Sequence, residues 1–169
     1  STETGRKNLH NLEEGFGCDV ISHKLDRDIL KKLTLHTFEK YGAPTWYIDS
    51  LIYAFPIKKT MELGLKLLVY GEDVNYTYGG NYDQETSSAL MQPMNEVVKS
   101  IHNEVIKDKI VSEKELQPAI IPSVDQCKDY DLEPIYLSYF TPWNSHHNYE
   151  VAKRWGFHHL GHEYKREGT

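Results

Sequence analysis

The stretch Leu65–Tyr82 reads Leu-Lys-Leu-Leu-Val-Tyr-Gly-Glu-Asp-Val-Asn-Tyr-Thr-Tyr-Gly-Gly-Asn-Tyr and holds the clearest boundary in the chain between a strand and a loop. Its first six residues are mostly apolar and lack helical spacing, which indicates a buried strand. Gly71 ends the apolar run, and two carboxylates, Glu72 and Asp73, follow it directly. Ligands of open parallel sheets bind just beyond the carboxyl ends of the strands. This strand end is therefore the best candidate for the edge of a functional site.

Helices and strands alternate on the N-terminal side of this strand. Apolar spacing and capping residues predict helices over residues 5–14, 26–41 and 46–63, and a strand over residues 19–25. Thr4 or Ser1 is expected to cap the first helix, Asp26 to cap the second and Gly42 to close it, and Pro56 is expected to kink or break the third. This order predicts a doubly wound, parallel α/β sheet.

The C-terminal half is predicted to add helices and one further strand. The helices are expected over residues 84–107, 112–116 and 145–155, with the strand over 134–140. Ser112, with Glu115 three residues later, fits a capping box at the start of the second of these helices. Asn144 or Ser145 is expected to cap the last helix, and Gly156 to end it. The prediction is one α/β domain with a sheet core (1–83), a helical insertion (84–133) and a final strand and helix (134–169).

Composition narrows the functional classes. The chain has 169 residues and a net charge of −6, which fits one domain and argues against a nucleic-acid-binding protein. Cys18 and Cys127 are far apart and lack a metal-binding spacing, which indicates a reducing, cytoplasmic setting. No apolar stretch approaches the roughly 18 residues that a membrane-spanning helix needs. We therefore expect a protein that binds neither nucleic acid nor membrane.

Spacing alone leaves two interpretations of the strand end at Glu72 and Asp73. Carboxylates suit hard cations such as Mg²⁺ beside phosphates, and the Gly79-Gly80 pair would let the backbone approach a phosphate or a sugar. The alternative, which spacing alone slightly favours, is an ordinary polar strand exit and turn. Neither a Walker motif nor a dinucleotide-binding glycine motif is present in the sequence.

A second strand exit is expected at 140–144, which reads Phe-Thr-Pro-Trp-Asn. A helix N-terminus is expected behind it, and such termini attract anions. Trp143 would either stack on a base or sugar or pack the corner of the sheet, and the residues favour neither. Tyrosines 76, 78 and 82 are hard to bury together in a polar loop, so a ligand wall is plausible there.

The histidines near the C-terminus invite a metal interpretation. His158 and His162 have the i, i+4 spacing that binds zinc on a helix, and His159 lies between them. Gly161 interrupts the segment and no cysteine is near, so solvated surface histidines are the favoured interpretation.

Several stretches match, in order, the motifs of one known family. Residues 70–73 (Tyr-Gly-Glu-Asp) and 78–80 (Tyr-Gly-Gly) resemble a Trp/Tyr-Gly-Glu-Asn…Glu-Tyr-Gly-Gly signature. Residues 136–143, followed by Asn-Tyr-Glu at 148–150, resemble a Tyr-Leu-x-x-Tyr-x-Pro-Trp segment. Residues 16–19 and 40–46 also align. The family is that of the N-acetyl sugar amidotransferases, the lipopolysaccharide-biosynthesis branch of the PP-loop ATP-pyrophosphatase superfamily.

The resemblance implies a fold and a reaction. The fold is a Rossmann-like sheet of the adenine-nucleotide alpha-hydrolase type with flanking helices, and the cofactors are ATP and Mg²⁺. ATP would adenylate the acetamido oxygen of a nucleotide-linked N-acetyl sugar and release pyrophosphate. Ammonia from a glutaminase partner would then displace AMP and leave an acetamidino group, as a step in surface polysaccharide biosynthesis. A homo-oligomer is among the forms the resemblance allows.

The resemblance also suggests residue roles. Glu72 or Asp73 would hold Mg²⁺ or orient the substrate. Close backbone approach would be allowed by Gly71, Gly79 and Gly80. Contacts to the sugar or nucleotide are expected from Tyr78 and Trp143, with Trp46 and Asp49 as weaker candidates.

The sequence also departs from the family. It has no Ser-Gly-Gly-x-Asp-Ser phosphate loop and no cysteine-rich segment, and Thr45-Trp46-Tyr47-Ile48 replaces a Cys-Trp-x-Cys motif. Asp73 stands where Asn is common, and Thr77 where Glu is common. We therefore expect the middle-to-C-terminal part of a longer enzyme, incomplete at its N-terminus and inactive alone. Two alternatives remain: a tRNA-thiolating PP-loop ligase, which the acidic charge and scattered cysteines disfavour, and a non-catalytic α/β binding or assembly domain.

Overall fold

The computed structural model describes residues 2–73, 86–90 and 96–160, and these fall into two compact units. The larger unit is His23–Pro142, and the smaller combines Ser1–Ser22 with Trp143–Thr169. No helix in the described ranges is long and apolar enough to cross a membrane. The predicted division at residues 83 and 133 stays a prediction.

The larger unit contains a parallel pair of strands. Strand β1 (Leu67–Tyr70) pairs with β2 (Glu133–Tyr136) in a register that joins Leu67 to Glu133 and Tyr70 to Tyr136. Ser88 forms an antiparallel bridge to Ile135 on the other side of β2. The parallel pair with flanking helices agrees with the predicted α/β class, and the strand predicted from residue 65 is confirmed with a shorter range.

Strand β1 is buried on one face only, so the prediction of a fully buried strand is wrong. Leu67 and Val69 are 55% and 47% exposed, whereas Tyr70 is 6% exposed. Successive side chains of a strand point to opposite faces. The face that carries Leu68 and Tyr70 is the one that lies beside a helix.

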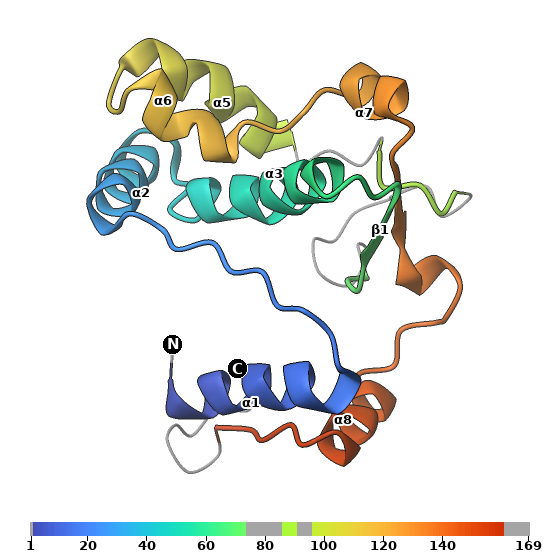
Figure 1. The fold of residues 1–169 in the computed structure, drawn as a ribbon. Helices are drawn as coiled ribbons and strands as arrows, with labels where there is room; N and C mark the ends of the chain where they lie inside the picture. Colours follow the sequence, from blue (N-terminus) through green and yellow to red (C-terminus); the bar gives the residue numbers. More distant parts are fainter. Residues whose placement is uncertain (1, 74–85, 91–95, 161–169) are drawn as a thin grey trace. The chain divides into compact units, whose positions relative to one another are not determined.

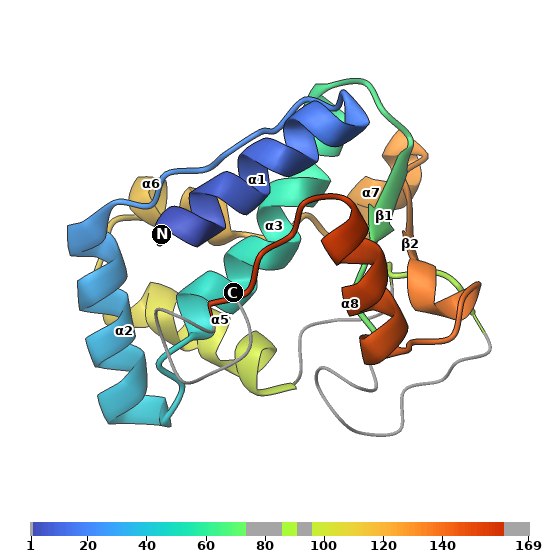
Figure 2. The ribbon, with the colours of Figure 1, turned by 90° about the horizontal axis from the view of Figure 1, so that it is seen from below.

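That helix, α3 (Trp46–Glu62), contacts α2, α5 and β1 and so links the helical and strand parts of the larger unit. The other helices are α2 (Arg27–Tyr41), α5 (Glu96–Asp108), α6 (Glu113–Leu116) and α7 (Val124–Tyr130), with 3₁₀ turns at Gln117–Ala119 and Leu137–Tyr139. Figures 1 and 2 show α2, α5 and α6 grouped toward one end of α3, and the strands and α7 toward the other.

Each end of α3 has its own hydrophobic cluster. At its N-terminal end, Trp46 packs with Leu33 of α2 and Val105 of α5, and all three are at most 1% exposed. At its C-terminal end, Ile57 packs with Cys127 of α7 and Leu132. The helix is therefore held by burial along its whole length.

This burial explains why α3 continues through Pro56. The predicted break is wrong, because the helix runs without interruption from Trp46 to Glu62. A proline inside a helix removes one backbone hydrogen bond and usually kinks or breaks it. Ala54 and Ile57, on either side of Pro56, are both buried, and their packing offsets that loss.

An ion-paired network joins α2 to the C-terminal end of α5. Lys40 donates to both carboxylate oxygens of Asp108 at 2.7 Å. His36 and the Tyr41 hydroxyl contact the same carboxylate at 2.8 and 3.0 Å. The hydrogen bond from Lys40, and then that from His36, lowers the pKa of Asp108 to about 2. Asp108 therefore connects two helices of the core, α2 and α5, from outside that core.

Helix caps predicted from the sequence are found. Asp26 caps α2 by accepting hydrogen bonds from the backbone N–H groups of residues 28 and 29, and Gly42 closes the helix at a φ of 67°. Ser112 caps α6 in the predicted capping box with Glu115. A second capping box, formed by Ser123 and Gln126, starts α7. The residue pattern of that box is present in the sequence, but α7 was not predicted from it.

Three predicted segments need correction. Residues 19–25 are irregular and not a strand, since Ile21 is 48% exposed and has no sheet to pair with in the described ranges. Of the helix predicted over 84–107, the structure describes α5 as Glu96–Asp108, and residues 87–89 are not helical because they bond to β2. The strand predicted over 134–140 ends at Tyr136, where a 3₁₀ turn takes over.

The smaller unit pairs α1 (Glu3–Phe16) with the segment that follows α8 (Ser145–Arg154). Asn8 donates to the carbonyl of His158 and accepts from its N–H, both at 2.8 Å. Asn11 donates to the carbonyl of Gly156 at 2.7 Å. The predicted helix at 5–14 is confirmed, but Thr2 caps it instead of Thr4 or Ser1. Asn144 caps α8, as one of the two residues expected there.

Candidate functional site

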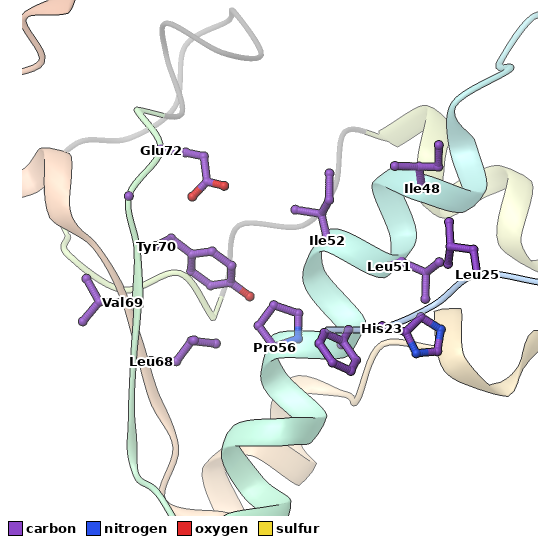
Figure 3. A pocket seen from close by; sticks show the side chains of 12 residues that line it. His23, Leu25, Ile48, Leu51, Ile52, Pro56, Leu68, Val69, Tyr70 and Glu72 are labelled. Carbon is purple, nitrogen blue, oxygen red and sulfur yellow. The ribbon is translucent and has the colours of Figure 1, made fainter. Parts of the chain in front are cut away.

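A cavity of about 520 Å³ lies between α3 and the end of β1, within the larger unit (Figure 3). One wall consists of side chains from α3, namely Ile48, Leu51, Ile52, Phe55 and Pro56. The opposite wall is formed by β1 and the residues just beyond it, namely Leu68, Val69, Tyr70, Gly71 and Glu72, and His23 and Leu25 close one side. Its volume falls in the range of small-molecule sites.

Helical and strand periodicity explain this arrangement. Ile48, Ile52 and Phe55 are spaced four and three residues apart, so they share one face of α3. Leu68 and Tyr70 alternate with exposed residues along β1 and therefore face α3. Ile48 and Ile52 remain 40% and 39% exposed. The apolar wall is thus open to solvent.

Aromatic contacts fix both sides of the cavity. The His23 and Phe55 rings lie 5.2 Å apart at an interplanar angle of 36°. The Tyr70 ring lies between Tyr53 and Tyr136, with centroid distances of 5.9 and 5.6 Å. Because ring pairs at these distances attract one another, the walls are held in place without a ligand.

Glu72 supplies the carboxylate of this cavity. Figure 3 shows its side chain reaching from the end of β1 into the space beside α3, above the Tyr70 ring. Among the described residues that line the cavity there is no lysine or arginine. The site can therefore hold an apolar group and, at its carboxylate end, a hydrogen-bond donor or a cation.

The structure brings together part of the predicted site. Gly71 and Glu72 both line the cavity, whereas Asp73 follows them outside its lining. The pairing of Tyr70 with Tyr136 places the ends of β1 and β2 side by side. The second strand exit was predicted further along the chain, at 140–144, and β2 does not extend that far. The predicted residues Tyr78, Gly79 and Gly80, and the tyrosines at 76 and 82, lie outside the described residues.

The other predicted site residues lie elsewhere. Trp46 is 0% exposed in the core, with its ring 6.0 Å from that of His102. Asp49 accepts a hydrogen bond from the Thr45 hydroxyl at 2.8 Å on the first turn of α3. Trp143 belongs to the smaller unit and donates to the Ser145 hydroxyl at 2.9 Å.

No group of three metal-ligating side chains occurs among the residues that the structure describes. The backbone of His158 is bound by Asn8, and the His159 ring lies 6.3 Å from the ring of Tyr149. His162 lies outside the described ranges, so the histidine spacing is not tested there.

A second cavity, of about 590 Å³, is lined by Lys58, Glu113, Lys114, Gln117 and Pro118. Lys58 donates to the Gln117 carbonyl at 2.5 Å, and burial lowers the pKa of its ammonium group. This contact ties α3 to the 3₁₀ turn. Lys58, the most buried charged side chain of the second cavity, therefore has a structural role.

Sequence reasoning missed the α3 wall of the first cavity. The signal was present, since α3 carries apolar residues on more than the one face that a core helix needs. The sequence does not distinguish Ile48 and Ile52 from the residues of α3 that pack in the core. Their exposure along the cavity distinguishes them in the structure.

No protein-family model matches the chain, and no curated protein matches it.

Proposed function

We propose that this chain forms the nucleotide-sugar site of an ATP-dependent amidotransferase of the PP-loop type, on a Rossmann-like sheet. The observation that carries the proposal is the position of Gly71 and Glu72. Both line a ligand-sized cavity just beyond the carboxyl end of a parallel strand, which is where α/β sheets bind ligands. The family motif at 70–73 supports the same assignment.

The proposed reaction replaces the oxygen of an acetamido group with nitrogen. The acetamido oxygen attacks the α-phosphorus of ATP, and pyrophosphate leaves. Ammonia from a glutaminase partner then adds to the activated carbon, and AMP leaves with the former acetamido oxygen. The product is an acetamidino sugar for surface polysaccharide, made in the cytoplasm.

The cavity suits the acyl end of such a substrate better than its phosphates. Ile52, Pro56 and Leu68 offer apolar contact, and the part of the lining that the structure describes contains no lysine or arginine that would offset phosphate charge. The sequence also has no phosphate-loop motif. In this proposal the phosphates of ATP are bound by groups other than those that line the cavity.

The carboxylates of the chain fit a Mg²⁺ site that is shared with substrate phosphates, and not a site formed by protein ligands alone. Mg²⁺ is commonly held by one or two carboxylates together with substrate phosphates. Glu72 and the adjacent Asp73 could supply such ligands, and bound Mg²⁺ would offset the charge of the phosphates. No third metal-ligating side chain joins them in the described ranges.

The test is pyrophosphate release by the complete gene product with ATP, Mg²⁺, ammonium and a UDP-linked N-acetyl sugar. We expect release that requires both the sugar and ammonium. Glu72→Ala should lower the rate about 100-fold, the order expected for a group that orients or stabilises the reacting atoms. The control is Glu133→Ala, an exposed carboxylate on the neighbouring strand and outside the cavity. Absence of sugar-dependent release contradicts the proposal, and sugar binding without release favours the non-catalytic alternative.

A further inference from the structure

We propose that the cavity between α3 and β1 selects a cationic, planar nitrogen group over its neutral counterpart, with Glu72 as the counter-ion. The identification of that group as the amidinium of the reaction product rests on the proposed function. The preference for a cation does not, because it follows from the cavity alone.

The first step of the argument is the distribution of charge. Glu72 lies at one end of the cavity, and the remaining titratable side chains in the lining are His23 and Tyr70. His23 is stacked against Phe55 on the opposite wall. A ligand group placed beside Glu72 therefore meets a carboxylate that no lysine or arginine neutralises within the described lining.

The second step is the surroundings of that carboxylate. Figure 3 shows it above the Tyr70 ring, with Ile52 of α3 across the cavity, so a bound group would be flanked by apolar surface. Ion pairs strengthen as water is displaced from around them. A planar amidinium can donate two parallel hydrogen bonds to a carboxylate, which an amide of the same shape cannot do.

The third step is the effect of an ion pair with Glu72 on the proposed reaction. The acetamido group is neutral, whereas the acetamidino group is protonated at neutral pH. Positive charge therefore develops beside Glu72 as nitrogen replaces oxygen. A fixed carboxylate at that point stabilises charge that appears only as the reaction proceeds. In this inference Glu72 acts on the organic group, and the adjacent Asp73 is the carboxylate that could hold Mg²⁺.

Benzamidine and benzamide are suitable probes, because they have the same shape and differ in charge. Their dissociation constants would be measured by titration calorimetry on the chain, with and without Mg²⁺. We expect benzamidine to bind about fivefold more tightly, the scale of a partly exposed ion pair. Glu72→Gln should abolish the preference, and Glu133→Gln should keep it.

Two further measurements separate the alternatives. Ile52→Ser should weaken both probes by a similar factor, because Ile52 forms the apolar wall and not the charged end. Millimolar Mg²⁺ should leave benzamidine binding unchanged. Equal binding of the two probes, no binding of either, a preference that survives Glu72→Gln, or competition by Mg²⁺ would each overturn the inference. Failure of sugar-dependent pyrophosphate release would instead remove the proposed function and leave the cation preference standing.

Discussion

The two sides of helix α3 are similarly apolar but meet different surroundings. Trp46 and Tyr47 are buried against α2 and α5, at 0% and 3% exposure. Ile48 and Ile52, on the same helix, are 40% and 39% exposed and line the cavity. The difference shows that one side of α3 is packed in the core, while the other leaves apolar surface exposed along the cavity. Substitutions on the two sides should therefore separate stability from binding.

The largest effect is expected from the core side. Trp46→Ala should lower the free energy of unfolding by about 3–5 kcal/mol, because a fully buried aromatic side chain leaves a cavity that the core cannot refill. Urea unfolding followed by circular dichroism measures it, and Trp46→Phe should cost less. A loss below about 1 kcal/mol would show that Trp46 is not part of the core and would restore its candidacy as a ligand contact.

A smaller effect is expected at the Asp108 network, which closes the core side. Its pKa of about 2 in the folded chain is below the usual value of 3.8. The stabilisation it gives is therefore fully present above about pH 4 and is lost as the pH falls through 2. Between pH 5 and 2, the midpoint temperature of thermal unfolding should fall more steeply with decreasing pH for the wild type than for Asp108→Asn. Parallel curves would mean that Lys40 and His36 do not hold this carboxylate in solution.

The smallest stability effect is expected on the cavity side. Ile52→Ser should change the free energy of unfolding by about 1 kcal/mol or less, because the side chain is already 39% exposed. The same variant should lose binding of the cavity probes. A loss of stability as large as that of Trp46→Ala would place Ile52 in the core and remove the distinction between the two sides.

Much of the local structure could be predicted because it depends on neighbouring residues. Asp26, Gly42, Ser112 and Asn144 act at helix ends through their own side chains or backbone, as their positions predicted. The strand ahead of Gly71 was likewise set by a local apolar run. Features of this kind need no knowledge of the rest of the chain.

The errors arose where tertiary contacts decide the outcome. Pro56 does not break α3, because buried residues on either side of it hold the helix. Residues 19–25 have the composition of a strand, but in the described ranges no strand pairs with them. Strand composition alone does not supply a partner, and pairing determines whether a strand forms.

Only the side of the candidate site that β1 forms was predicted from the sequence. Gly71 and Glu72 were identified because a strand end followed by carboxylates is a local pattern. Ile52, Phe55 and His23 reach the same cavity from other segments, and only the folded arrangement brings them there. Trp46 was chosen for its type and place in a motif, and the structure puts it in the core.

The most direct test of the account is to map benzamidine binding on the ¹⁵N-labelled chain by amide chemical shifts. The account predicts shifts at Ile52, Gly71 and Glu72 that saturate together, with Leu33 and Val105 of the core unchanged. Shifts confined to the core, or to the second cavity around Lys58, would contradict the claim that the α3–β1 cavity is the ligand site.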